Sequence, residues 1–455
     1  MLLRKSPFKP DDIERDPNGF ALRIDEIFTC VSCLFNKKNL LITGPRGIGK
    51  SSLAGQLQNL YSPDTTLLKR CSISGSLGKY LQIYYAIDSS ASLSDICIDI
   101  IHRIENSNCL LNQYYIDNKK KVKFKLNLAV FKTSLESDIV SNKPSSIVTQ
   151  FIGALSTAYN SLKFIGYEGV NIVIDELDCI AANINFGHFI KLIHEYCSAD
   201  KLENITFLFV GQRGLYSRLL TEDHSVERLI THVPISKLCP KESEHILDYA
   251  GRTARPPFSI DEDASTAILK IAGGFPYVIK LLGDAAFANM DNVNRMTMVD
   301  VSEGLRHVLR ADKHEKYLGY LSEMTTDQRL IISIFGTFES KEMPARIPIE
   351  WVANECKNKH SLENDHTIKL VEEIRKLGFI VIDSVSNTIQ FNDELFRLFI
   401  LLRRKYMELD QEEYGHELEV VPYTEDEVHN LIDYFEEAEA NLNWDVDEAR
   451  YLLRY

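Results

Sequence analysis

The fold is decided by the stretch Gly44-Pro45-Arg46-Gly47-Ile48-Gly49-Lys50-Ser51. It satisfies the pattern G-x-x-x-x-G-K-[ST] and lies between an apolar run at residues 39–43 and a stretch with helical periodicity at residues 51–61. A strand, a glycine loop and a helix in this order are the context that a phosphate-binding loop requires. The alternative is a plain glycine turn before a helix, which the flanking strand and helix disfavour. The sequence therefore predicts a nucleotide-binding α/β domain.

The residue types in this loop suit phosphate chemistry. Gly44 and Gly49 let the backbone pass close to phosphate oxygens, where a Cβ atom would clash. The exposed N–H groups and the N-terminus of the following helix then face the anion. We expect Lys50 to reach the β- and γ-phosphates and the Ser51 hydroxyl to ligate Mg²⁺. Further contacts to the nucleotide are expected from Pro45, Arg46, Gly47, Ile48 and Ser52.

A second motif supplies carboxylates. The apolar run at residues 170–174 is followed by Asp175, Glu176 and, two residues later, Asp178. In an open α/β sheet, ligands bind at the C-terminal ends of the strands. We expect Asp175 to hold the Mg²⁺ shell through water and Glu176 to orient or deprotonate the attacking water. Asp178 is expected to cap the following helix.

The rest of the chain gives the predicted organisation. Further apolar runs at residues 82–87 and 205–210 alternate with helix-period stretches, which indicates a parallel sheet covered on both faces. Strict alternation at residues 121–128 predicts a half-exposed strand in a hairpin. Beyond residue 238 the strand pattern stops, until two short strands at 379–382 and 388–391 follow three helical stretches, as in a winged helix. The predicted division is an arm at 1–20, a P-loop ATPase core at 21–238 with a hairpin insertion at about 118–135, a helical lid at 239–320, a winged helix at 321–406 and an acidic segment at 407–455.

Composition and charge limit the function classes. The 455 residues are 45% hydrophobic and 25% charged, as in ordinary globular proteins. Residues 407–455 contain 16 acidic and two basic residues and carry the whole net charge of −14. The remaining chain is neutral, so it lacks the overall field that attracts nucleic acid. The sequence has no apolar run of membrane-spanning length and no secretory signal. Its nine scattered cysteines favour reduced thiols over disulfides. Together these features predict a cytoplasmic protein.

The order of these motifs resembles the AAA+/STAND branch of P-loop ATPases, and within it the origin-recognition-like prokaryotic ATPases. The resemblance rests on the loop at 44–51, on Ile174-Asp175-Glu176-Leu177-Asp178, and on the lid and winged helix that follow, and it covers about residues 18–400. It implies an ATP phosphohydrolase with ATP and Mg²⁺ as cofactors.

The resemblance also implies sensors. Gln212 or Arg213, after the apolar run at 205–210, would sense the γ-phosphate; a plain surface arginine is the alternative for Arg213. Arg228 resembles an arginine finger, which acts across a subunit boundary, or else pairs with a neighbouring acid.

Two further positions are carried over from the family. Pro276, in Gly274-Phe275-Pro276, resembles the proline that packs near adenine, and Lys280 follows one helical turn later. Alternatively, Pro276 only starts a helix. Arg23 is the counterpart of an arginine near the base, although a leucine stands where relatives have glycine.

Two functions are compatible with these features. The first is an ATP-driven switch that self-associates and regulates assembly with separately encoded partner proteins, in a setting of prokaryotic antiviral defence or a mobile element; that setting comes from the resemblance. The second is a DNA-binding initiator or loader that uses the winged helix. The lysines at 119–125 suit either an exposed edge strand or nucleic acid. Aromatic residues among the acids at 407–455 favour short docking helices over a plain tail, and Cys30 and Cys33 are expected to pack in the core.

Overall fold

The structure is a computed structural model of the chain. It describes residues 4–400, except for residues 62–65, 75–77, 89, 115–143, 165, 182–183, 201, 203, 309–313, 337, 339–344, 361, 384–385, 394 and 398. The predicted hairpin at about 118–135, with the lysines at 119–125, lies outside the described residues. So does the acidic segment at 407–455.

The chain divides into two compact units. One is Ile13–Ser236, and the other combines Met1–Asp12 with Lys237–Tyr455. The sequence predicted a single arm at residues 1–20 and a boundary at 238. In the structure, residues 4–12 group with the second unit and residues 13–20 with the first.

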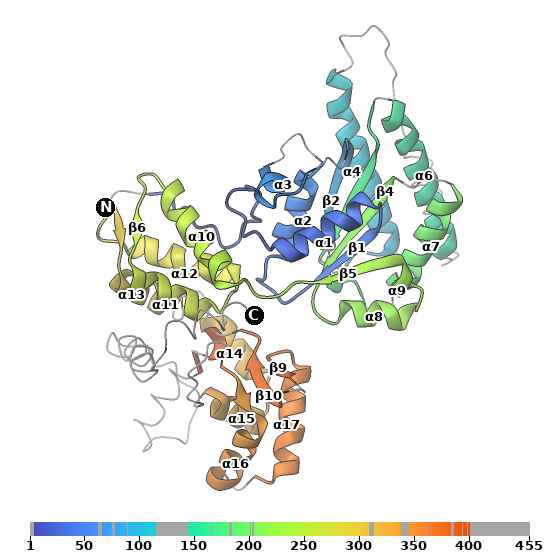
Figure 1. The fold of residues 1–455 in the computed structure, drawn as a ribbon. Coiled ribbons are helices and arrows are strands. Elements are labelled where there is room, and N and C mark those ends of the chain that lie inside the picture. Colours follow the sequence, from blue (N-terminus) through green and yellow to red (C-terminus); the bar gives the residue numbers. More distant parts are fainter. Residues whose placement is uncertain are drawn as a thin grey trace. The chain divides into compact units, whose positions relative to one another are not determined.

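A parallel sheet forms the centre of the first unit, which we call the α/β unit (Figure 1). Its strands are β1 Asn39–Thr43, β2 Tyr80–Ala86, β3 Gly169–Asp175, β4 Ile205–Gly211 and β5 Ile230–Pro234. They lie in the order β2-β3-β4-β1-β5, and every pairing is parallel. This confirms the predicted α/β fold of the P-loop NTPase type. The sequence did not predict β5, because its five residues include Thr231 and His232 and directly follow a short helix.

Helices cover both faces of this sheet. On one face lie α1 Ile24–Phe35 and α2 Lys50–Asn59, and on the other lie α4 Leu93–Tyr114, α6 Pro144–Phe164 and α7 Phe186–Ala199. The strands are buried on both sides, and β3 and β4 are buried at every position. Shorter elements complete the unit: α3 Thr66–Arg70, η2 Leu177–Cys179, α8 Leu215–Glu222 and α9 Val226–Leu229.

Residues 13–20 are fixed to the α2 side of the sheet. The Glu14 N–H donates to Ser52 Oγ at 3.0 Å, and Gln56 Nε2 donates to the Glu14 carbonyl at 2.8 Å. The Arg70 guanidinium donates to the Pro17 carbonyl and, at 3.0 Å, to that of Phe20. The start of the α/β unit is therefore bonded to the helix that follows the phosphate loop.

The second unit begins with a helical part. It contains α10 Pro240–Thr253, α11 Glu262–Ala272, α12 Pro276–Asn289 and α13 Met298–His307. Two parallel two-residue strands, β6 Ser259–Ile260 and β7 Arg295–Met296, join its loops. The expectation that no strand falls between residues 238 and 379 was wrong here, because strands of two residues leave no periodic pattern.

The remaining described residues form a second, mixed part. It contains α14 His314–Ser322, α15 Thr326–Gly336, β8 Ile347–Pro348, α16 Ile349–His360, α17 Asn364–Lys376, β9 Ile380–Asp383 and β10 Thr388–Phe391. The strands form an antiparallel sheet in the order β8-β10-β9, one strand more than predicted. Tyr317 and Tyr320 of α14 pack against Phe396 and Phe379 with ring centroids 5.3 and 4.8 Å apart. Thus α14, most of which the sequence placed in the lid, packs with this part.

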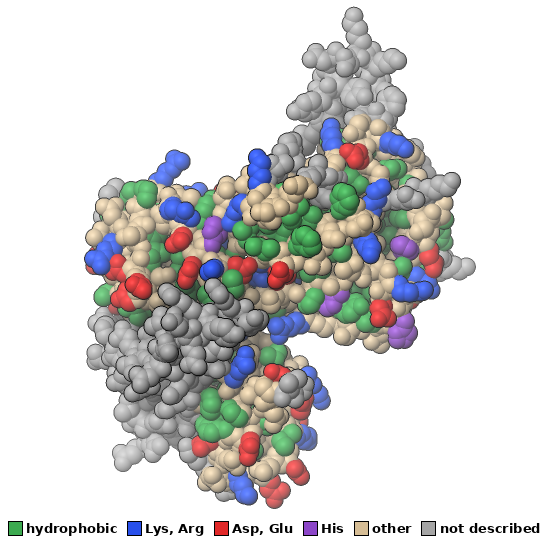
Figure 2. All heavy atoms as spheres, viewed as in Figure 1, with side chains coloured by type: hydrophobic (Ala, Val, Ile, Leu, Met, Phe, Trp, Pro, Cys, Tyr) green, Lys and Arg blue, Asp and Glu red, His purple; other side chains and the backbone are tan. Residues whose placement is uncertain are grey.

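One helix of the α/β unit leaves large apolar side chains uncovered. Ile24, Phe28 and Phe35 of α1 are 53, 64 and 68% exposed, and their spacing places them along one line of the helix. Figure 2 shows hydrophobic side chains on the surface of this unit. On its buried side α1 contributes Cys30, which packs in the core, and this burial raises the pKa of the Cys30 thiol to about 12. No helix in the described part of the chain combines the length and the apolar character that crossing a membrane requires.

Candidate nucleotide-binding site

The glycine loop lies between the end of β1 and the start of α2. Gly47 and Gly49 have φ angles of 75° and 95°, in the left-handed region that favours glycine. At Gly44 an added Cβ would come within 3.0 Å of the Ile235 and Ile48 side chains. The loop thus has the close-packed backbone that a phosphate cradle requires, and Lys50 is the first residue of α2.

Lys50 lies among the predicted catalytic carboxylates. Its Nζ donates to the Pro45 carbonyl at 2.9 Å. Burial lowers the pKa of Lys50, while Asp178, Asp175 and Glu176 act in the opposite direction. The fold therefore brings the strand tip that carries these acids to the loop, as the sequence predicted.

Asp175 and Glu176 are adjacent in sequence but differ in environment. Asp175 ends β3 and is only 2% exposed, whereas Glu176 is exposed. Glu176 has φ 56° and ψ 36°, a left-handed conformation that costs a non-glycine residue about 1–3 kcal/mol. The Glu176 N–H donates to Asp175 Oδ1 at 2.7 Å. The turn leaves one carboxylate buried at the strand tip and places the other on the solvent side.

Sequence reasoning missed Tyr84 of β2. Its hydroxyl donates to Asp175 Oδ2. Tyr84 pairs with Val173, two residues before Asp175, so all three side chains project from the same face of the sheet. The only available signal was a tyrosine in an apolar run, which is typical of any strand.

Asp178 does not cap the next helix, so that expectation was wrong. Its Oδ1 accepts the Gln212 N–H at 2.9 Å, and its Oδ2 accepts Gln212 Nε2 at 2.7 Å. The cap of α7 is Asn185, which accepts the His188 N–H at 2.8 Å. The sequence favoured Asp178 because it precedes a helical stretch, but η2 intervenes and turns the carboxylate toward the end of β4.

The two candidate arginines of this unit are exposed. Neither Arg213 nor the Arg228 side chain forms a hydrogen bond or an ion pair within the described part of the chain. Arg228 lies on α9, which the buried Val226 anchors. Asp223 accepts the Ser225 N–H at 2.9 Å, and this bond holds the pKa of Asp223 at about 2. The short helix is therefore well anchored, although its arginine has no partner among the described residues.

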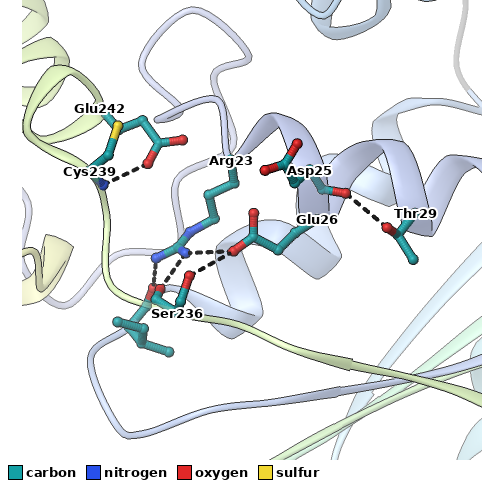
Figure 3. Close-up of polar contacts among 8 residues, drawn as sticks. Arg23, Asp25, Glu26, Thr29, Ser236, Cys239 and Glu242 are labelled. Carbon is teal, nitrogen blue, oxygen red and sulfur yellow. Dashed lines mark hydrogen bonds and ion pairs between the residues drawn. The ribbon is translucent and has the colours of Figure 1, made fainter. Parts of the chain in front are cut away.

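Arg23 lies between the glycine loop and the residues after β5, and its predicted place beside an adenine stays a prediction (Figure 3). Its guanidinium donates to the Ile48 carbonyl in the phosphate loop and to the Ser236 carbonyl after β5, both at 2.6 Å. Arg23 is 2% exposed, and Glu26 Oε1 lies 3.5 Å from its Nη1. Bonds from a charged donor are stronger than neutral ones. Arg23 thus ties the loop to the last residue of the α/β unit.

Pro276 and Lys280 belong to the second unit. Pro276 is the first residue of α12 and follows a turn in which Gly273 and Gly274 have φ angles of 53° and 80°. The Leu238 N–H donates to the Gly274 carbonyl at 2.9 Å, and a Cβ on Gly274 would clash with the Leu238 carbonyl. Gly274 is required by this contact, and the roles of Pro276 and Lys280 toward a nucleotide stay predictions.

The donor set fits Mg²⁺ bound together with phosphate. No group of three or more His, Cys, Asp or Glu side chains in the described ranges is arranged to hold a metal by itself. Mg²⁺ is commonly held by one or two protein oxygens, several waters and the substrate phosphates. Ser51 and Asp175 can supply those oxygens, because the Tyr84 hydroxyl contacts Asp175 and lies beside Ser51.

Comparison with protein families agrees with this geometry. Residues 33–219 match the family model described as the AAA domain. The matched residues include the glycine loop, Tyr84, Asp175, Glu176, Gln212 and Arg213. Arg23, Arg228 and Pro276 lie outside it.

Solved structures of similar fold include origin-recognition proteins. The ADP form of the Aeropyrum pernix ORC2 protein is 14% identical, with a TM-score of 0.47, and the match covers 90% of this chain and 100% of that one. The Aeropyrum pernix ORC1 protein in complex with DNA is 13% identical, with a TM-score of 0.41 and coverages of 85% and 94%. For Cdc6p from Pyrobaculum aerophilum the values are 14%, 0.40, 87% and 97%. A comparison with curated proteins gives no match.

Proposed function

We propose that this chain is an ATP-binding and ATP-hydrolysing molecular switch of the AAA+/STAND type. The observation that carries the proposal is the convergence of Lys50, Asp175 and Glu176 beside the glycine loop. A cation at the start of α2, with a buried and an exposed carboxylate at the end of β3, matches the three tasks of phosphate binding, metal binding and water activation. The match of residues 33–219 to the AAA domain supports the same conclusion.

In this proposal each residue has a separate task. Lys50 pairs with the β- and γ-phosphates, while the loop N–H groups and the start of α2 bind their oxygens. Ser51 and Asp175 hold Mg²⁺, which when bound neutralises charge on the phosphate oxygens. Glu176 accepts a proton from, or orients, the water that attacks the γ-phosphate. Gln212, already bonded to Asp178, or Arg213 reports the presence of that phosphate.

The switch is proposed to act through assembly. ATP binding would favour self-association, with Arg228 entering the site of a neighbouring subunit, and the assembled form would engage separately encoded partner proteins. The support is local: Arg228 is exposed, has no partner among the described residues and lies on a helix that is itself anchored. A role in prokaryotic defence or in a mobile element is part of this proposal.

The alternative is a DNA-binding initiator or loader. It would place α17 of a winged helix, the fold predicted for residues 321–406, in the major groove. Two basic side chains of α17 are already near acids of the same helix, since Arg375 lies 2.7 Å from Glu372 and Lys369 lies 4.0 Å from Glu373. Figure 2 also shows blue and red side chains interspersed on the visible face. Phosphate contacts supply much of the affinity for DNA, so these features favour the switch.

Two measurements on the purified full-length chain test the proposal. Sedimentation with ATP, with ADP and without nucleotide should show a larger species with ATP, and chains without nucleotide-dependent association would contradict the assembly part. Fluorescence anisotropy with duplex DNA at several salt concentrations addresses the alternative. Binding that weakens steeply with salt would support the initiator, while no binding supports the switch.

A further inference from the structure

Tyr84 lies on the strand next to the one that carries the catalytic carboxylates. β2 pairs with β3 in parallel, with Tyr84 opposite Val173 and Ala86 opposite Asp175. Tyr84 projects from the face of the sheet that α2 covers, the helix on which Ser51 lies. The side chain is half-buried, and its hydroxyl reaches Asp175 at the C-terminal end of β3.

The hydroxyl contacts one of the two residues that are predicted to hold Mg²⁺, Asp175, and lies near the other, Ser51. It donates to Asp175 Oδ2, while Asp175 Oδ1 accepts the Glu176 N–H at 2.7 Å. Both carboxylate oxygens therefore have a donor from the chain itself, and the carboxylate has a fixed orientation. Burial is the main cause that raises the pKa of Tyr84, and the negative charge of Asp175 adds to it. The Ser51 side chain acts in the opposite direction.

We propose that Tyr84 is a positioning residue for magnesium: its hydroxyl fixes the Asp175 carboxylate beside the Ser51 hydroxyl, so that both meet the same ion. This inference rests on the proposed binding of nucleotide and Mg²⁺. Residues that orient a metal ligand affect metal affinity by about 10- to 100-fold when they are removed. Tyr84 does not need to contact the ion for such an effect.

The same contacts separate this role from general support of the fold. The backbone of Tyr84 is held by the parallel ladder to β3, and its carbonyl accepts Arg103 Nη1 at 2.9 Å. Neither bond involves the hydroxyl. Tyr84→Phe should therefore fold with the strand in place and change only the orientation of Asp175.

Tyr80→Phe provides a matched control. Tyr80 lies four residues earlier on the same strand and the same face, and its ring packs on Tyr61 at 4.8 Å. The chemical change is identical, but Tyr80 is at the opposite end of β2 from the strand tip. Circular dichroism melting curves of both variants would verify that they fold.

The experiment measures Mn²⁺ binding by electron paramagnetic resonance in the presence of ADP, and ADP binding in EDTA by calorimetry. Tyr84→Phe should weaken Mn²⁺ binding by about tenfold or more, with ADP affinity in EDTA unchanged, and Tyr80→Phe should leave both as in the wild type. Wild-type Mn²⁺ affinity in Tyr84→Phe would overturn the inference. So would an equal loss of ADP affinity in EDTA, which indicates a structural role. A wild-type chain that binds no ADP would instead overturn the proposed function on which the inference depends.

Discussion

The strand tips and the arginine-bearing segments differ in how far the chain itself fixes their side chains. At the tips of β3 and β4, Asp175 is held by Tyr84 and Asp178 binds Gln212. Arg213 and Arg228, in contrast, are exposed and pair with none of the described side chains. Side chains that are fixed before the ligand arrives need no reorganisation when it binds. The carboxylates are thus held by contacts within one chain, while in the proposed function the arginines contact a nucleotide or another subunit.

The largest effect on nucleotide affinity is expected at Lys50, the cation beside the carboxylates. Lys50→Ala should weaken both ATP and ADP binding by at least about 30-fold, since a hydrogen-bonded charge contributes roughly 2 kcal/mol or more. Isothermal titration calorimetry measures both affinities. Lys38→Ala, at an exposed lysine just before β1, is the control and should bind as the wild type does.

Glu176→Gln tests the carboxylate side without removing the Lys50 charge that is proposed to pair with phosphate. The variant should bind ATP normally but hydrolyse it about 10²- to 10⁴-fold more slowly, because only the proton acceptor is lost. Calorimetry and phosphate release measured on the same sample give both quantities. If Glu176→Gln and Lys50→Ala lose ATP affinity equally, the assigned roles are wrong.

The proposed role of Arg228 predicts that inactive variants complement each other across subunits. Arg228→Ala and Glu176→Gln should each be inactive, yet their mixture should regain part of the turnover, because one intact composite site can form. Mixing Arg213→Ala with Glu176→Gln is the matched control, since a sensor that acts within its own subunit cannot be complemented this way. The mixture of Arg228→Ala and Glu176→Gln could also stay as inactive as each variant alone. If size-exclusion chromatography then shows that the two variants assemble together, Arg228 does not act as an arginine finger across subunits.

The smallest effect is expected at Arg23. Arg23→Ala removes two bonds from the loop and the end of β5, so nucleotide affinity should fall by about 3- to 10-fold, roughly one typical hydrogen bond. The loss should be equal with and without Mg²⁺, because Arg23 acts on the loop backbone and not on the metal ligands. A loss seen only with Mg²⁺ would contradict this role.

Local patterns predicted the parts of the fold that repeat over several residues. The glycine loop, the buried run of β3 and the alternation of strands with helices all follow from spacing along the chain. The short strands β5, β6, β7 and β8 were missed because two to five residues, often with polar side chains, leave little periodicity. Their pairing is set by neighbours far away in sequence.

The residues of the site divide in the same way, into those that a local motif predicts and those that depend on distant contacts. The sequence predicted that Lys50 and Asp175 lie near the glycine loop, because each belongs to a short motif whose residue types and spacing suit phosphate and Mg²⁺. Tyr84, Arg23 and the Asp178–Gln212 pair act through contacts with distant segments. Arg23, for example, bonds to a carbonyl 213 positions later. Nothing in the residues around Asp178 indicates that its carboxylate turns to β4 instead of capping a helix.

Phosphate release from ATP by the full-length wild type and Lys50→Ala, side by side with and without Mg²⁺, tests the central claim most directly. The account predicts Mg²⁺-dependent release by the wild type and none above background by Lys50→Ala. Equal release by the two proteins would show that the activity does not arise at the loop between β1 and α2. A folded wild type that neither binds nor hydrolyses ATP would contradict the account as a whole.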